Sequence, residues 1–135
     1  MAIITWTEAQ FGTHIAATDE EHQTIFNMLN KLHDTVTAGD LPAANALLDK
    51  FIPFVAKHFK TEEDLMTAHN YPNFAAHKAA HDKLVETALG LQKQVHEGKA
   101  QLSAETTAFV RDWLVNHIPN IDKPYGPYLN DHGVR

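Results

Sequence analysis

The sequence predicts an all-α fold, an up-down-up-down four-helix bundle with an N-terminal arm and a short C-terminal tail. Two observations carry this prediction. Apolar residues recur every three or four positions along four long segments, which is the period of a helix that buries one face. Short runs of turn and capping residues separate these segments, and short connections favour antiparallel neighbours. We expect one domain over residues 1–135, with the arm at 1–18, the bundle at 19–122 and the tail at 123–135.

Capping and turn residues set the expected bounds of the four helices. Pro53 falls inside the second helix and should kink it, because proline removes a backbone donor. Pro119 should disturb the end of the fourth helix for the same reason. The helices are expected from the cap Asp19 to Gly39, from Asp40 to the turn at 70–73, from Asn73 to Glu97, and from the cap Ser103 to Pro119.

Composition excludes several classes of function. The chain has no cysteine, which excludes disulfides, thiolate catalysis, zinc fingers and iron–sulfur clusters. Its net charge of −6 argues against nucleic acid or an anionic membrane as a partner. No apolar run approaches the roughly 20 residues that cross a bilayer, and the first residues lack the pattern of a signal peptide. We therefore expect a cytoplasmic protein that does not insert into a membrane.

Several polar residues occupy positions that should face the interior of the bundle. His58 with Glu62, and His77 with His81, form two pairs at i, i+4 spacing, so each pair lies on one side of its helix. A turn lies between the pairs and makes them face each other. Buried imidazoles and carboxylates need partners, and a metal centre would satisfy all of them together. The candidate ligands are His22, His58, Glu62, His77, His81, His117 and Asp122.

The alternative for any single histidine is a hydrogen-bonded core residue, and only the combined pattern favours a metal. Asp122 stays open on this reasoning, because on a regular helix it would lie about 140° away from His117. A π-bulge or an early helix end at Pro119 could bring it round. The remaining histidines belong to no spaced pair and are expected to be surface or packing residues, namely His14, His33, His69, His96 and His132.

The number and kind of these ligands indicate two metal ions. Five imidazoles and two carboxylates exceed the needs of one ion, and a carboxylate has two oxygens with which to bridge a pair. Without sulfur, the set suits iron, manganese or zinc. Carboxylate-rich di-iron bundles use Glu-x-x-His motifs, and this chain has none. Neutral imidazoles in their place should stabilise ferrous iron and favour reversible binding of dioxygen.

The same residues resemble the hemerythrin family, and within it the single-domain bacteriohemerythrins. The segments that carry the resemblance are TDEEH, HFKTEE, AHNYPNFAAHKAAH and WLVNHIPNID, and they span most of the chain. The resemblance implies two iron ions (Fe2+/Fe3+) joined by an oxo or hydroxo bridge. It implies that His77, His81 and His117 bind one iron. His22 and His58 would bind the other, which takes dioxygen, and Glu62 and Asp122 would bridge the two.

Apolar residues next to the ligands are expected to wall the dioxygen site and exclude water, namely Ile25, Phe59, Trp113, Leu114 and Ile118. The function that follows is reversible binding of dioxygen for transport, storage or delivery to an oxygen-consuming enzyme. The protein would then be a binding protein and not an enzyme. Two alternatives remain open: a sensor of dioxygen or redox state, and a di-iron enzyme with oxidase, peroxidase-like or nitric-oxide-handling activity. The short loops favour a monomer.

Overall fold

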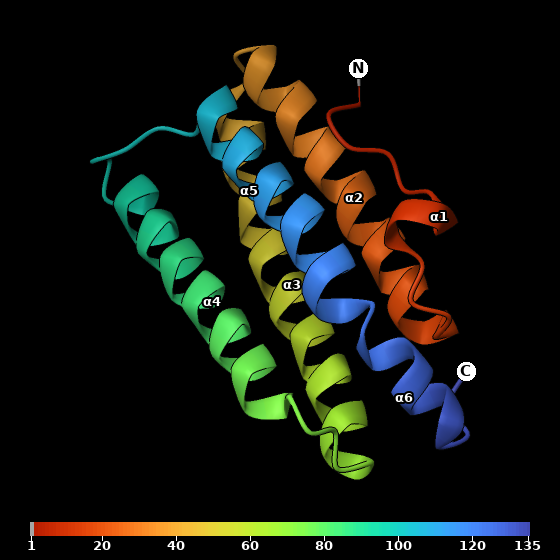
Figure 1. The fold of residues 1–135 in the computed structure, drawn as a ribbon. Coiled ribbons are helices and arrows are strands. Elements are labelled where there is room, and N and C mark those ends of the chain that lie inside the picture. The colour runs from red at the N-terminus through yellow and green to blue at the C-terminus, as the bar shows by residue number, and fades with distance from the viewer. Residues whose placement is uncertain (1) are drawn as a thin grey trace.

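The computed structural model describes residues 2–135 and shows a bundle of four long helices (Figure 1). The chain runs alternately up and down through them, which confirms the predicted fold class. No helix within residues 2–135 is both long and apolar enough to cross a membrane. The four helices are α2 (Ala16–Thr37), α3 (Leu41–Ala68), α4 (Phe74–His96) and α5 (Ala104–His117).

Most helix ends lie where the capping residues predicted them. The Asp40 side chain accepts a hydrogen bond from the Ala43 amide at the start of α3, and α3 continues through Pro53. Gly39 follows α2 with a φ of +80°, a backbone conformation that glycine adopts without strain. The start of α2 was predicted wrongly, because the helix begins at Ala16 and not after Asp19.

Asp19 stabilises the start of α2 from within the helix. Its carboxylate accepts hydrogen bonds from the backbone amide and the hydroxyl of Thr13, at 2.8 and 2.7 Å. The Thr13 hydroxyl also lies 2.9 Å from the hydroxyl of Thr18. These contacts fold the preceding loop over the first turn, so the helix begins three residues before the side chain that the capping rule selects.

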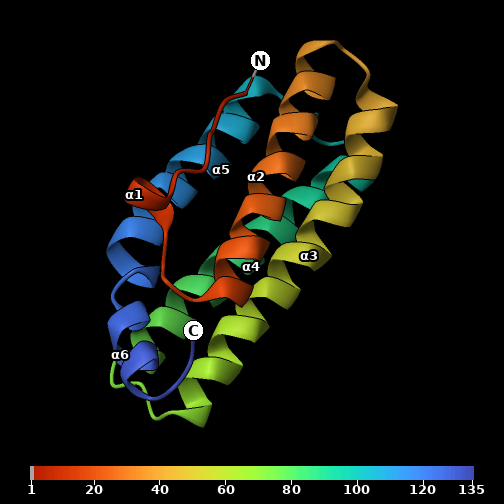
Figure 2. The same cartoon turned by 90° about the vertical axis from the view of Figure 1, so that its right-hand side faces the viewer.

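The N-terminal arm packs along the bundle before the chain enters α2 (Figure 2). The Asn30 side chain accepts from the amides of Ile3 and Ile4 and donates to the Ile4 carbonyl. The arm contains the short helix α1 (Glu8–Phe11), and Ile4 and Phe11 are buried in the core. The arm therefore closes one side of the interior.

The chain after α5 is also part of the folded interior. A π-helical turn, η1 (Ile118–Asp122), follows α5 directly, and the last helix is α6 (Tyr125–Asp131). Tyr125 and Leu129 of α6 are fully buried. They pack in a cluster with Ile15, Met66 and Tyr71, at the end of the bundle where α3 turns into α4.

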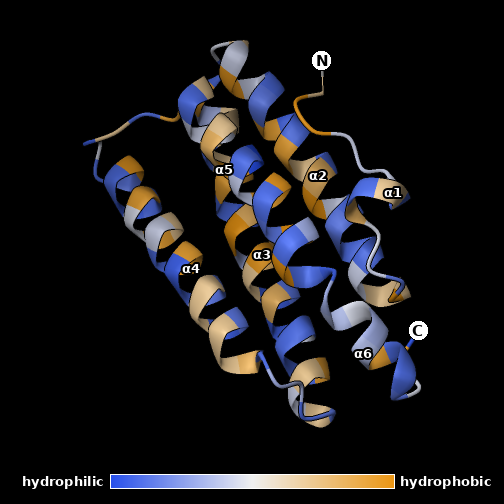
Figure 3. Cartoon of the chain, in the orientation of Figure 1, coloured by the Kyte–Doolittle hydropathy of each residue, from blue (hydrophilic) through white to orange (hydrophobic). Residues whose placement is uncertain are grey.

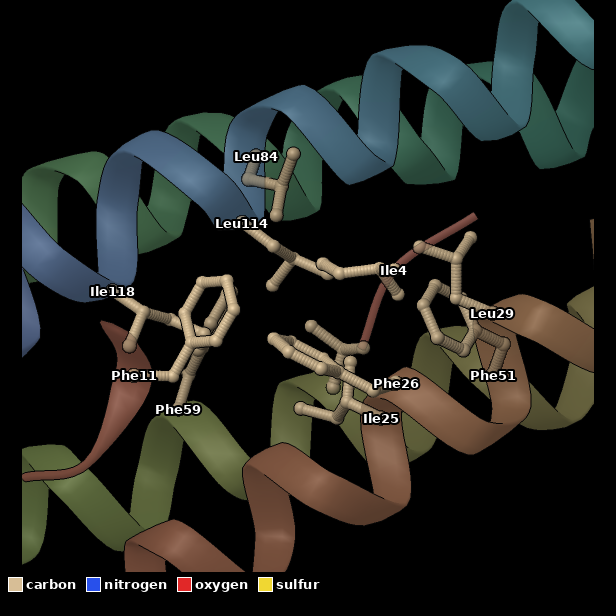
Figure 4. Close-up of a cluster of buried hydrophobic side chains, with 11 residues drawn as sticks. Ile4, Phe11, Ile25, Phe26, Leu29, Phe51, Phe59, Leu84, Leu114 and Ile118 are labelled. Atoms are coloured by element: carbon tan, nitrogen blue, oxygen red, sulfur yellow. The ribbon is translucent and has the colours of Figure 1, made fainter. Parts of the chain in front are cut away.

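Each long helix carries apolar residues on one side and polar residues on the other (Figure 3). The largest apolar cluster fills the middle of the bundle, with Ile25, Phe59 and Leu114 among its members (Figure 4). Helix α4 packs closely against α3, whereas α4 and α5 do not approach each other in this way. Between the central cluster and the one around Tyr125 lies a layer of buried polar side chains.

Candidate metal centre

The buried polar layer consists of the seven predicted ligands. Helix α2 supplies one, α3 and α4 supply two each, and α5 and η1 supply one each. No member is more than 6% exposed. The structure therefore brings together residues that are up to 100 positions apart in the sequence, namely His22, His58, Glu62, His77, His81, His117 and Asp122.

These residues form two groups that share one carboxylate. Within each group, one possible ligand atom of every member lies within 4.8 Å of those of the others. The five histidines divide between the two groups in the same way as between the two ions that the resemblance implied, whereas Glu62 belongs to one group only. The ions and the assignment of ligands to them stay a prediction. One group is His77, His81, His117 and Asp122, and the other is His22, His58, Glu62 and Asp122.

Asp122 faces both groups with different oxygens. Its Oδ1 lies 2.8 Å from His77 Nε2 and 3.0 Å from His117 Nε2. Its Oδ2 lies 3.1 Å from His22 Nε2. A carboxylate placed in this way can bind one ion through each oxygen, which is the arrangement of a bridging ligand.

Glu62 also lies between the two groups. Its Oε1 is 3.3 Å from the Nε2 atoms of both His58 and His81, and its Oε2 is 3.5 Å from His22 Nε2. Glu62 and His58 are one turn apart on α3, so the helix itself fixes their relative position. The second carboxylate is thus placed as a bridge as well.

The π-helical turn explains how Asp122 reaches the site. The amide of Lys123 donates to the carbonyl of Ile118 at 2.9 Å, which is the i to i+5 pattern of a π-helix. Pro119 has no amide hydrogen to continue the α-helical pattern. The wider turn brings Asp122 to the same side as His117, as the expected distortion at Pro119 required.

The buried atoms at the centre lack hydrogen-bond partners. Within residues 2–135, this holds for Nε2 of all five histidines and for one oxygen of each carboxylate. Native proteins leave few buried polar atoms without a partner, so this concentration calls for an explanation. Imidazole nitrogens and carboxylate oxygens together are the ligand set of a transition metal, and a cation would satisfy all of these atoms at once. The residues fit a metal centre.

Two glutamates orient two of the histidines by binding the ring nitrogen that faces away from the centre. His58 Nδ1 donates to Glu21 Oε1 at 2.7 Å, and His81 Nδ1 donates to Glu63 Oε2 at 2.9 Å. A proton held at Nδ1 leaves the Nε2 lone pair available to a metal, and such carboxylate–histidine pairs are common around metal sites. The sequence analysis did not identify either role. The only signal is that each glutamate is next to a ligand in the sequence.

Tyr125 is a further contact that the sequence analysis missed, because it lies in the segment assigned to the tail. Its hydroxyl donates to Glu62 Oε2 at 2.6 Å, and its ring is fully buried. The ring also stacks near that of His77, with centroids 5.8 Å apart and planes 18° apart. Burial raises the pKa of Tyr125 well above its usual value, and the charge of Glu62 adds to this, so the hydroxyl keeps its proton.

The buried charges of the centre shift one another's pKa values. Burial alone would lower the pKa of His58, but the charge of Glu62 and the hydrogen bond to Glu21 raise it to about 10. Burial would raise the pKa of Glu62, yet the charge of His58 and the close contacts with His22 and His81 hold it well below 4.5. The pKa of Asp122 is likewise lowered and that of His22 raised. Protons on His22 and His58 therefore offset the charges of the carboxylates, and a bound cation would replace these protons.

The predicted pocket residues lie beside the centre, and their contacts differ. Phe59 stacks on His81 with ring centroids 3.8 Å apart, and Trp113 stacks on His117 at 4.0 Å. Both aromatic rings therefore cover the three-histidine group. Ile25, Leu114 and Ile118 are buried in the central apolar cluster (Figure 4). Trp113 is only half-buried.

A cavity of about 80 Å³ extends from this cluster along the bundle, away from the polar layer. Most of its lining is aliphatic or aromatic, and Ile25 and Leu114 lie at its border. Each of these two residues is three positions from a histidine of the centre. The interior next to the centre is thus apolar and contains unfilled space.

The fold and the site define a class of protein, the histidine-rich metal-binding four-helix bundles. Comparison with known proteins narrows this class. Residues 13–129 match the family model described as the hemerythrin HHE cation binding domain. The chain belongs to the hemerythrin family.

Similar proteins cover almost the whole chain. The bacteriohemerythrin of Methylococcus capsulatus (strain ATCC 33009 / NCIMB 11132 / Bath) is 53% identical over 130 residues, which are 96% of this chain and 99% of that protein. The myohemerythrin of Theromyzon tessulatum is 32% identical over 120 residues, 89% of this chain and 88% of that protein. A crystal structure of wild-type hemerythrin superposes with a TM-score of 0.93 at 53% identity, over 95% of this chain and 98% of that one.

Proposed function

We propose that this protein binds dioxygen reversibly at a non-haem di-iron centre, for transport, storage or delivery to oxygen-consuming enzymes. The observation that carries the proposal is that the unpartnered Nε2 atoms of five histidines converge with two carboxylates in a buried layer. The family supports iron as the metal, since the relatives named above are hemerythrins.

We assign the ligands according to the two groups of the structure. His77, His81 and His117 would hold one iron, and His22 and His58 the other. Glu62 and Asp122 would bridge them, together with an oxo or hydroxo group from solvent. The distances from Asp122 to histidines of both groups support its role. When bound, the irons would supply the electrons that hold dioxygen and take them back on release.

The chain's own residues would keep the reaction reversible. The iron with two histidines has one protein ligand fewer, so it has room for dioxygen. Ile25, Leu114 and Ile118 present apolar atoms next to the centre and should keep out the water and protons that promote irreversible oxidation. Phe59 and Trp113 would complete this shielding by covering the rings of His81 and His117.

We propose a carrier that works as a single domain over residues 1–135 and as a monomer, and not an enzyme. Release of a fixed amount of dioxygen per chain when the solution is deaerated would support a carrier. Repeated turnover with a reductant would instead support a di-iron enzyme, and a conformational change on oxidation would support a sensor. Light scattering at several concentrations tests the monomer.

Metal analysis and absorption spectra of the deoxygenated, aerated and azide-treated protein test the proposal. Two irons per chain and a charge-transfer band that appears with dioxygen are expected. His77→Ala should lose this band, whereas His96→Ala, an exposed position on the same helix, should keep it. One zinc per chain with no spectral response would refute the proposal.

A further inference from the structure

Tyr125 makes a hydrogen bond to the centre that the proposed binding of iron leaves unexplained. Its hydroxyl donates to Glu62 Oε2 at 2.6 Å, and both side chains are fully buried. Charge-assisted hydrogen bonds of this length are the strong ones. The contact joins residues that are 63 positions apart, so it depends on how α6 docks against α3.

The position of Tyr125 is set by the packing of α6 on both sides of it. The α-carbon of Gly126 lies so close to the Thr13 carbonyl that a side chain there would not fit. Leu129 is fully buried one turn further on. The hydroxyl of Tyr128 donates to the carbonyls of His69 and Asn70, which anchors α6 to the turn between α3 and α4. The phenol is therefore held against Glu62 by a rigid element.

The hydrogen bond makes the two oxygens of Glu62 unequal. Oε2 accepts the phenol proton, whereas Oε1 has no hydrogen-bond partner. An oxygen that shares its electron density with a donor gives less of it to a metal ion, and groups behind a ligand also fix its orientation. Oε2 is thus the weaker ligand atom of the two.

We propose that Tyr125 is a positioning residue that holds Glu62 across the centre and weakens one of its two oxygens as a ligand. The inference rests on the proposed di-iron centre. Weaker donation favours the ferrous state, since less negative charge reaches the iron. Tyr125 would thereby raise the reduction potential of the centre and slow its irreversible oxidation.

Tyr125→Phe tests this inference, because it removes the hydroxyl and keeps the ring beside His77. We expect a lower reduction potential, a shift of the charge-transfer bands, and loss of iron to a chelator that is roughly 10-fold faster. Tyr128→Phe is the matched control, because it removes a hydroxyl from the same helix that touches no ligand, while the close packing of Gly126 and Leu129 still holds α6 in place. That control should keep the wild-type potential and spectrum.

Two results would overturn the inference. One is a Tyr125→Phe protein with the wild-type potential and spectrum. The other is an equal change in both variants, which would show that Tyr125 acts only by anchoring α6. Loading with Co2+, whose absorption reports the ligand geometry, repeats the comparison without iron. If the wild-type protein fails to take two irons, the proposed function fails, and the Co2+ spectra of the variants still decide the role of Tyr125.

Discussion

Gly126→Ala offers a test of how closely α6 docks onto the start of α2. A Cβ atom at this position would lie 2.1 Å from the Thr13 carbonyl oxygen, where real contacts essentially never fall below 3.0 Å. The obstacle is backbone, so it cannot rotate away. Thr13 is itself held by Asp19 at 2.8 Å, which prevents the loop from yielding easily. The two segments must separate by about 1 Å.

The free-energy cost of this separation can be estimated and converted to a change in melting temperature. Overpacking of a well-packed interior costs about 1–3 kcal/mol. For a chain of this size, each kcal/mol lowers the melting temperature by roughly 3–5 °C. Because Tyr125 is the preceding residue, a shift of α6 should also lengthen its 2.6 Å hydrogen bond to Glu62. We therefore expect both lower thermal stability and faster loss of iron.

Thermal unfolding followed by circular dichroism, with and without iron, measures the effect. Gly90→Ala is the control, because Gly90 lies within α4 and a Cβ there meets nothing within 4 Å. Alanine in a helix interior should stabilise by about 0.5–1 kcal/mol relative to glycine. The two glycines should thus respond with opposite signs. A melting temperature of Gly126→Ala at or above that of the wild type would refute the reasoning.

Two further predictions concern the pocket and the pH. Leu114→Ala should lower the free energy of unfolding by about 2–5 kcal/mol and should speed the oxidation of the oxygenated protein in air. The control is Leu48→Ala, at another part of the same cavity, which should lower stability without speeding oxidation. Loss of the oxygenated spectrum with time measures this, and equal rates in both variants would contradict the shielding role. Before iron is bound, folding raises the pKa of His58 from 6.5 to about 10. Protonated His58 therefore contributes its full stabilisation of the folded state below pH 6.5, and this contribution is lost as the pH rises toward 10. Because iron binds the unprotonated ring, the apparent affinity of the protein for iron should increase over the same pH range. Titrations with a competing chelator at several pH values measure this affinity, and an affinity that does not change with pH would contradict the prediction.

The fold and the buried polar layer could be predicted because both depend on local spacing. A helix repeats every 3.6 residues, so polar residues on an apolar stripe stand out in the sequence. His58 with Glu62, and His77 with His81, are conspicuous for this reason. Even Asp122 could be recognised as a candidate, since Pro119 marked the helix as irregular.

Contacts between distant segments could not be predicted in the same way. Glu21 and Glu63 stand beside ligands in the sequence, but an acidic residue next to a buried face usually points to solvent. Tyr125 reaches Glu62 only because α6 folds back against α3, and no local pattern encodes that docking. The start of α2 was misplaced for a related reason, because Asp19 acts on Thr13 from inside the helix.

The loose side of the bundle gives the metal a role in assembly. Helix α4 packs along α3 and makes little close contact with α5. In the proposed centre, one ion would bind His77 and His81 from α4 and His117 from α5, and so would join two helices that otherwise make little close contact.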